Sequence, residues 1–102
     1  MDQTEIIRKA EEYIKLIREI LFLRKAVLFG SYANGNPQSF SDIDIGLFID
    51  SLDPDDDYFH LMERLYELAD DIDVRIEPHL FIKSEDRSGF SEEIERTGIT
   101  IG

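Results

Sequence analysis

Two short apolar runs, separated by only twelve residues, constrain the fold of this 102-residue chain most strongly. The first run is AVLF at residues 26–29, and the second is DIDIGLFI at residues 42–49, which alternates before it becomes fully apolar. Continuous apolar runs of this length are typical of buried strands, and alternation is typical of a strand with one polar face. The two runs therefore predict neighbouring strands of a sheet.

Amphipathic helices are predicted on both sides of these strands. Apolar residues recur at three- and four-residue spacing over residues 4–23 and again over residues 58–70. Arg24 and Lys25 are expected at the end of the first helix, where cations complement the helix dipole. Asp53 is expected to cap the second helix, with the acidic residues that follow it in the first turn. The sequence thus predicts one helix before the strand pair and one after it.

A third strand and a short C-terminal helix complete the predicted elements. The segment DVRIEPHLFI at residues 73–82 predicts a strand in which Pro78 marks a bulge or an exposed edge. The tail FSEEIERTGITIG predicts a short helix that ends at Gly98, followed by a small last strand. We therefore expect an α+β fold, a small mixed sheet with helices packed on it, as a single domain over residues 1–102.

The composition is strongly acidic beyond the first helix. Residues 26–102 carry five Lys and Arg against eighteen Asp and Glu, and the formal net charge of the chain is −12. Because such a field repels a nucleic-acid backbone, direct binding of nucleic acid is not expected. The chain has no cysteine, charges interrupt its N-terminal segment, and no apolar run is long enough to span a bilayer. We expect a cytoplasmic protein without membrane contact.

Asp42 and Asp44 are the first candidates for a catalytic or metal-binding site. Residues two apart on a strand share a face, so both carboxylates point the same way and repel each other unless a cation lies between them. Carboxylate oxygens suit hard cations such as Mg²⁺, and two such ions can stabilise the attacking and the leaving oxygen of a phosphoryl transfer. Asp73 is the favoured third carboxylate, provided that its strand pairs beside the second one, and Glu77 is the competing candidate.

Gly30 and Ser31 form a turn suited to holding a phosphate. Gly30 ends the first strand and lets a ligand approach the backbone. Ser31 is expected to cap a short helical turn whose free N–H groups would bind an anion, and Tyr32 lies inside that turn, where it would flank a nucleotide. By contrast, His60 and His79 have no second histidine or cysteine at ligand spacing, and we expect both to be structural.

Together these features resemble a known signature. A strand, Gly30-Ser31, ten residues and then Asp42-x-Asp44 on a second strand resemble the motif of the nucleotidyltransferase superfamily that includes DNA polymerase beta. The match is to its smallest branch, the MNT-type minimal nucleotidyltransferases. Two further segments look like the family's third-carboxylate strand and its C-terminal segment, namely Ile72-Asp73-Val74-Arg75 and Arg96-Thr97-Gly98-Ile99. The resemblance covers most of residues 24–102.

The resemblance implies a magnesium-dependent nucleotidyl transfer. Asp42 and Asp44 would bind two Mg²⁺ ions, while Asp73 would ligate one of them and deprotonate the attacking hydroxyl. That hydroxyl would attack the α-phosphorus of ATP, and pyrophosphate would leave. Metal ions would supply most of the positive charge that such a transfer requires.

The resemblance also implies a set of nucleotide contacts. Members of the family often carry arginine where this chain has Asn34, so a charged phosphate contact is missing. Arg75 would compensate in part if its side chain turns toward the site. The expected nucleotide-binding residues are Gly30, Ser31, Tyr32, Asn34 and Arg75.

A protein partner is implied as well. MNT proteins are typically paired with a HEPN-domain toxin, so the resemblance implies an antitoxin that transfers AMP from ATP to a tyrosine of a HEPN partner. An acidic antitoxin suits a toxin that must bind RNA. Two alternatives stay open: a binding module that neutralises the partner by complex formation alone, and a transferase that modifies a small molecule. Homo- and hetero-oligomers are both left open.

Overall fold

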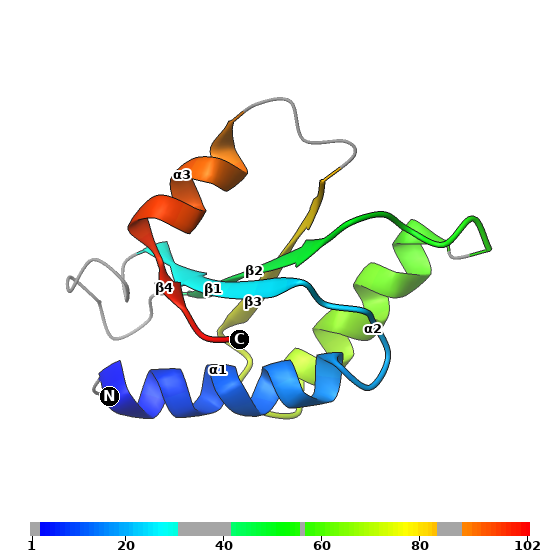
Figure 1. The fold of residues 1–102 in the computed structure, drawn as a ribbon. Helices are drawn as coiled ribbons and strands as arrows, with labels where there is room; N and C mark the ends of the chain where they lie inside the picture. Colours follow the sequence, from blue (N-terminus) through cyan, green and yellow to red (C-terminus); the bar gives the residue numbers. More distant parts are fainter. Residues whose placement is uncertain (1–2, 31–41, 56, 84–88) are drawn as a thin grey trace.

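The described helices and strands follow one another in the order that the sequence predicts. The computed structural model describes residues 3–30, 42–55, 57–83 and 89–102. Over these residues the elements are α1 (Gln3–Ile17), β1 (Lys25–Phe29), β2 (Ile43–Ile49), α2 (Tyr58–Asp70), β3 (Ile76–Ile82), α3 (Phe90–Thr97) and β4 (Ile99–Thr100) (Figure 1). None of the helices in this part of the chain combines the length and the hydropathy needed to cross a bilayer.

The four strands form one mixed sheet in the order β3-β2-β1-β4. β1 pairs antiparallel with β2 and with β4, whereas β2 pairs parallel with β3. The fold is therefore α+β, as expected. β3 lies at an edge of the sheet, which explains how it accommodates Pro78, a residue without a backbone N–H group.

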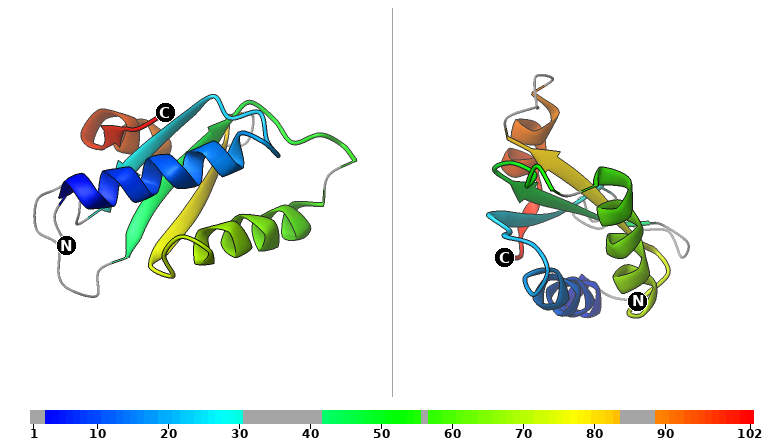
Figure 2. Two further views of the ribbon diagram at one scale, coloured as in Figure 1. Left: turned by 90° about the horizontal axis from the view of Figure 1, so that it is seen from below. Right: turned by 90° about the vertical axis from the view of Figure 1, so that its right-hand side faces the viewer.

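The two faces of the sheet are covered unequally. α1 and α2 pack on one face, and α3 lies on the other (Figures 1 and 2). The main core fills the first interface, where the Tyr13 hydroxyl of α1 donates a hydrogen bond of 2.9 Å to the Leu65 carbonyl of α2. The inward-facing positions alternate along β2, and they are Ile43, Ile45, Leu47 and Ile49.

The alternate residues of β2 and β3 face the side of the sheet that carries α3. Phe48 and Phe81 stack there with ring centroids 5.0 Å apart, and Phe48 belongs to the small core that Ile94 of α3 joins. Asp44 and Glu77 occupy the opposite end of the same face, where β2 and β3 begin. The pleat thus leaves the carboxylates on the face that α1 and α2 do not cover.

Three predicted boundaries are wrong. α1 ends at Ile17 and not at residue 23, because Leu23 turns back into the core and the Leu23 carbonyl accepts a hydrogen bond of 2.9 Å from Arg18 Nη1. Lys25 consequently begins β1 instead of ending the helix. The N-cap of α2 is Asp57, whose side chain accepts a hydrogen bond from the Phe59 N–H. The predicted cap, Asp53, lies further upstream, where its side chain accepts a hydrogen bond from the Asp55 N–H.

The third wrong boundary bears on the site. β3 begins at Ile76 and not at residue 73. The Asp73 side chain accepts a hydrogen bond from the Arg75 N–H, and the Asp73 carbonyl accepts one from the Ile76 N–H, so these residues form a turn. Aspartate favours such local bonds over a strand ladder. Asp73 therefore does not share a strand face with Glu77.

Candidate active site

Asp44 occupies a crowded position near the beginning of β2. Its backbone pairs with Phe29 of β1 on one side and with Glu77 of β3 on the other. Gly30 follows Phe29 with a φ of +80°, and a β-carbon at Gly30 would lie 2.5 Å from Asp44 Oδ2. Only glycine satisfies both the left-handed backbone and the close approach, so this residue is required for the placement of the Asp44 carboxylate.

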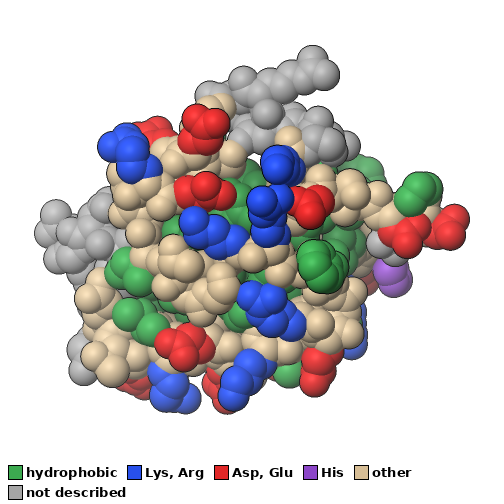
Figure 3. All heavy atoms as spheres, in the orientation of Figure 1, with side chains coloured by type: hydrophobic (Ala, Val, Ile, Leu, Met, Phe, Trp, Pro, Cys, Tyr) green, Lys and Arg blue, Asp and Glu red, His purple; other side chains and the backbone are tan. Residues whose placement is uncertain are grey.

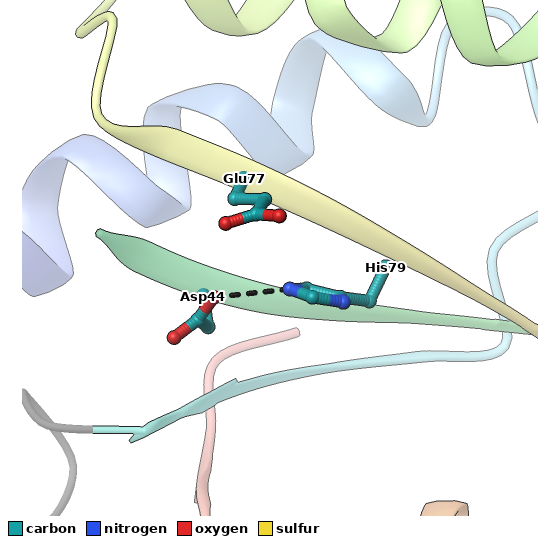
Figure 4. A group of neighbouring side chains, drawn as sticks. All are labelled: Asp44, Glu77 and His79. Atoms are coloured by element: carbon teal, nitrogen blue, oxygen red, sulfur yellow. Dashed lines mark hydrogen bonds and ion pairs between the residues drawn. The ribbon is translucent and has the colours of Figure 1, made fainter.

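Asp44, Glu77 and His79 converge on one point of the sheet (Figure 4). Each offers one ligand atom, and these atoms all lie within 4.8 Å of one another. His79 Nε2 lies 3.0 Å from Asp44 Oδ1, at hydrogen-bonding distance, and all three side chains are partly exposed. The register of β2 and β3 creates this group, because it places Glu77 directly beside Asp44.

Asp42 joins the same group from just before β2. The Glu77 carboxyl donates a hydrogen bond to Asp42, and this bond raises the pKa of Glu77 above its ordinary value. Burial and the negative charges of Asp42 and Asp44 raise this pKa further, while His79 lowers it. Glu77 thus interacts with both aspartates.

Charges of both signs lie at the other end of this face, where Glu92 and Glu95 line the same cavity as Arg24. A cavity of about 430 Å³ lies beneath α3 there, and its walls include Lys25, Lys83 and the stacked ring of Phe81. Figure 3 shows Lys and Arg side chains interspersed with Asp and Glu side chains on the face of the molecule that it draws. The carboxylate end differs in that Asp42, Asp44 and Glu77 gather there.

This donor set fits a divalent cation. Two carboxylates and one imidazole converge, and a third carboxylate, that of Asp42, is hydrogen-bonded to Glu77. Neighbouring carboxylates repel one another when they are ionised, and a cation relieves that repulsion. Carboxylate oxygens are the usual protein ligands of Mg²⁺, and an imidazole nitrogen adds a donor that transition metals accept. Asp42, Asp44, Glu77 and His79 are the residues that would hold the ion.

The family follows from the comparison with known proteins. The model of the family described as polymerase beta, nucleotidyltransferase matches residues 8–101. The chain belongs to this nucleotidyltransferase family. No curated protein matches it significantly. The match confirms the predicted resemblance, and it places the carboxylate end of the sheet in a domain that performs nucleotidyl transfer.

Solved structures agree with this assignment. A candidate nucleotidyltransferase from Sulfolobus solfataricus is 18% identical in sequence to this protein, with a TM-score of 0.67. The match covers 96% of the present chain and 80% of the Sulfolobus chain. A toxin–antitoxin with AMP-PNP is 26% identical with a TM-score of 0.62, over 90% of this chain and 72% of that one. A mutant of the MntA–HpeT toxin–antitoxin is 23% identical with a TM-score of 0.57, over 100% of this chain and 73% of that one. The two likenesses under 25% identity support the fold alone.

The Asp73 carboxylate points away from Asp42 and Asp44, although the sequence favoured it as the third carboxylate. Its carboxylate is only 8% exposed and accepts hydrogen bonds from Arg75 Nη2 at 2.6 Å and from Lys9 Nζ at 2.8 Å. The hydrogen bond from Arg75, above all, holds the pKa of Asp73 well below its usual range. The physical reason for the difference is the turn over residues 73–75, which directs this carboxylate toward α1.

The predicted nucleotide contacts are placed only in part. Gly30 lies beside Asp44, as described above, and the Arg75 guanidinium binds both carboxylate oxygens of Asp73. Ser31, Tyr32 and Asn34 lie outside the described residues. The nucleotide-binding roles of all five residues stay predictions.

His79 is the site residue that sequence reasoning missed. It was expected to be structural because it lacks a second histidine or cysteine nearby in the sequence. The available signal was the two-residue period of β3, which puts Glu77 and His79 on one face. That signal becomes informative only once the pairing of β3 with β2 is known.

Proposed function

We propose that this nucleotidyltransferase transfers AMP from ATP to a hydroxyl group on a protein partner, a tyrosine of a HEPN toxin, and so acts as an antitoxin. The observation that carries the proposal is the convergence of Asp42, Asp44 and Glu77 beside Gly30 in a chain of this family. We assign the third carboxylate to Glu77 rather than Asp73. Glu77 is hydrogen-bonded to Asp42 and offers a ligand atom within 4.8 Å of one from Asp44, whereas Asp73 is bound by Lys9 and Arg75.

Divalent cations complete the site in this proposal. Asp42, Asp44 and Glu77 would hold two Mg²⁺ ions, which would supply positive charge to the triphosphate and to the developing transition state. Three adjacent carboxylates would otherwise repel the phosphates of ATP. The cluster is accessible to ions and to substrate, since the Asp44 side chain is 22% exposed and that of His79 is 32% exposed.

The residues of the chain then position the reactants. Gly30 and Ser31 would bind the phosphates through the backbone, and the carboxylates fix where the α-phosphorus lies. The acceptor oxygen forms a bond to that phosphorus, the bond to the bridging oxygen of the β-phosphate breaks, and pyrophosphate leaves. Glu77 would accept the proton of the attacking hydroxyl, a role that a positioned carboxylate can perform. Positioning and charge stabilisation account for most of the catalysis in such transfers.

The partner is inferred from one structural neighbour and from charge. The 26% identical neighbour is a toxin–antitoxin crystallised with AMP-PNP, an analogue of ATP. A net charge of −12 complements a basic partner surface of the kind that binds RNA.

The test combines modification with neutralisation. The chain is incubated with ATP, Mg²⁺ and the protein encoded beside it, and the intact mass of that protein is measured. One added AMP is expected, together with loss of the partner's ribonuclease activity. The double variant Asp42→Asn, Asp44→Asn is expected to bind the partner but to leave its mass and its activity unchanged.

Two results would contradict the proposal. The first is an unchanged mass under conditions in which the two proteins form a complex. The second is a double variant that still neutralises the partner, which would favour neutralisation by complex formation alone.

A further inference from the structure

We propose that His79 is a metal ligand of this site through Nε2, and that the site therefore prefers a transition metal such as Mn²⁺ over Mg²⁺. The inference rests on the proposed function, which requires a metal site at these carboxylates. It adds a nitrogen donor to their oxygen ligands. It concerns which ion binds and through which atom.

The position of the imidazole carries the inference. His79 Nε2 lies 3.0 Å from Asp44 Oδ1, so the nitrogen already points at an oxygen that would ligate the ion. A ligand atom from Glu77 lies within 4.8 Å of both. One nitrogen and two oxygens with these separations are close enough to bind a single ion together. Figure 4 shows the three side chains pointing toward one another from β2 and β3.

The fold holds the His79 ring in this orientation. His79 is on β3, where its backbone pairs with Gly46 of β2. The Phe29 ring packs edge-on against the imidazole with centroids 4.9 Å apart, and Phe29 also contacts Phe90 of α3 at 6.4 Å. A ring fixed by neighbours on two other elements loses little further freedom when it binds an ion.

The chemistry of the donors sets the preference. Mg²⁺ demands oxygen ligands and near-ideal octahedral geometry, and it gains little from an imidazole. Mn²⁺ and the later divalent metals accept imidazole nitrogen together with carboxylate oxygen. Loss of His79 should therefore weaken binding of Mn²⁺ much more than binding of Mg²⁺.

A hydrogen bond that merely orients Asp44 is the competing role for His79. A glutamine at this position retains an N–H donor for Asp44 but supplies no imidazole nitrogen. If His79 only positions Asp44, His79→Gln should retain Mn²⁺ binding. If His79 is a ligand, the same variant should lose affinity for Mn²⁺.

The experiment uses Mn²⁺ alone, without nucleotide. Electron spin echo spectroscopy of Mn²⁺ bound to the wild-type chain should show coupling to a ligated ¹⁴N nucleus, and labelling histidine with ¹⁵N should change that signal. Titration should show that His79→Gln weakens Mn²⁺ binding by about 10-fold or more and changes Mg²⁺ affinity by less than about 3-fold. His60→Gln, which replaces the exposed histidine of α2, is the matched control and should match the wild type.

The wild-type spectrum alone can overturn the inference. Bound Mn²⁺ without histidine nitrogen coupling would show that His79 is not a ligand, whether or not any variant folds. An equal loss of affinity for both metals in His79→Gln would likewise contradict the preference. Neither result depends on AMP transfer, so failure of the proposed function would be seen separately, as an unmodified partner protein.

Discussion

Gly30 and Asp44 approach each other so closely that a β-carbon on Gly30 would lie 2.5 Å from Asp44 Oδ2. The contact joins the end of β1 to the beginning of β2, across the antiparallel pair that Phe29 and Asp44 form. The glycine of the predicted phosphate turn therefore has a second role, because it leaves space for the carboxylate of the site.

Gly30→Ala is expected to damage both stability and activity. The φ of +80° costs an L-residue about 1–2 kcal/mol, and the added methyl group would displace the Asp44 carboxylate. We expect a lower urea midpoint and a loss of AMP transfer of about 10-fold or more. Gly89→Ala is the matched control, because Gly89 has a φ of +76° but nothing within 4 Å of the added β-carbon. Equal losses of transfer in both variants would contradict the account.

Asp73 is expected to stabilise the fold in a pH-dependent way. Because its pKa is lowered in the folded state, its contribution is present above the ordinary aspartate pKa and is lost as the pH falls below about 4. Asp73→Asn should cost about 2 kcal/mol near pH 7, since it leaves Lys9 and Arg75 without this partner. Urea unfolding of both proteins between pH 7 and pH 2 should show the difference shrinking with acid. A difference that does not depend on pH would show that Asp73 is not ionised in these pairs.

Tyr13 is expected to contribute through its buried hydroxyl. Burial, more than any other cause, raises the pKa of Tyr13 well above its ordinary value, so the hydroxyl stays protonated and donates to the Leu65 carbonyl. Tyr13→Phe should lower the free energy of unfolding by about 1 kcal/mol. Tyr58→Phe, at a position 43% exposed, should change it by less than about 0.5 kcal/mol, and urea denaturation measures both. Equal effects would argue against a stabilising bond between α1 and α2.

The sequence predicted the elements well because their signals are local. The alternation in β2 placed Asp44 on the face opposite Ile43 and Ile45, and Gly98 ended α3 as expected. The predicted start of β3 was wrong because the Asp73 side chain, and not a neighbouring strand, accepts the hydrogen bond from the Arg75 N–H. Strand propensity alone does not reveal such a local bond.

The site was predicted less completely because it depends on register. Asp44 and Glu77 are 33 positions apart in the chain, and only the parallel pairing of β2 with β3 makes them neighbours. Shifting that pairing would have placed another residue beside Asp44. The contact of His79 with Asp44 depends on the same pairing, which the apolar pattern of either strand alone does not determine.

The most direct test of the account compares Glu77 with Asp73. The intact mass of the partner protein is measured after incubation with ATP, a divalent cation and either the wild-type chain, Glu77→Gln or Asp73→Asn, with folding of each variant verified by circular dichroism at the assay temperature. We predict that wild type and Asp73→Asn add one AMP to the partner, and that Glu77→Gln, which removes the proton acceptor and a metal ligand, adds none. Transfer by Glu77→Gln together with its absence in a folded Asp73→Asn would contradict the assignment and restore Asp73 as the third carboxylate.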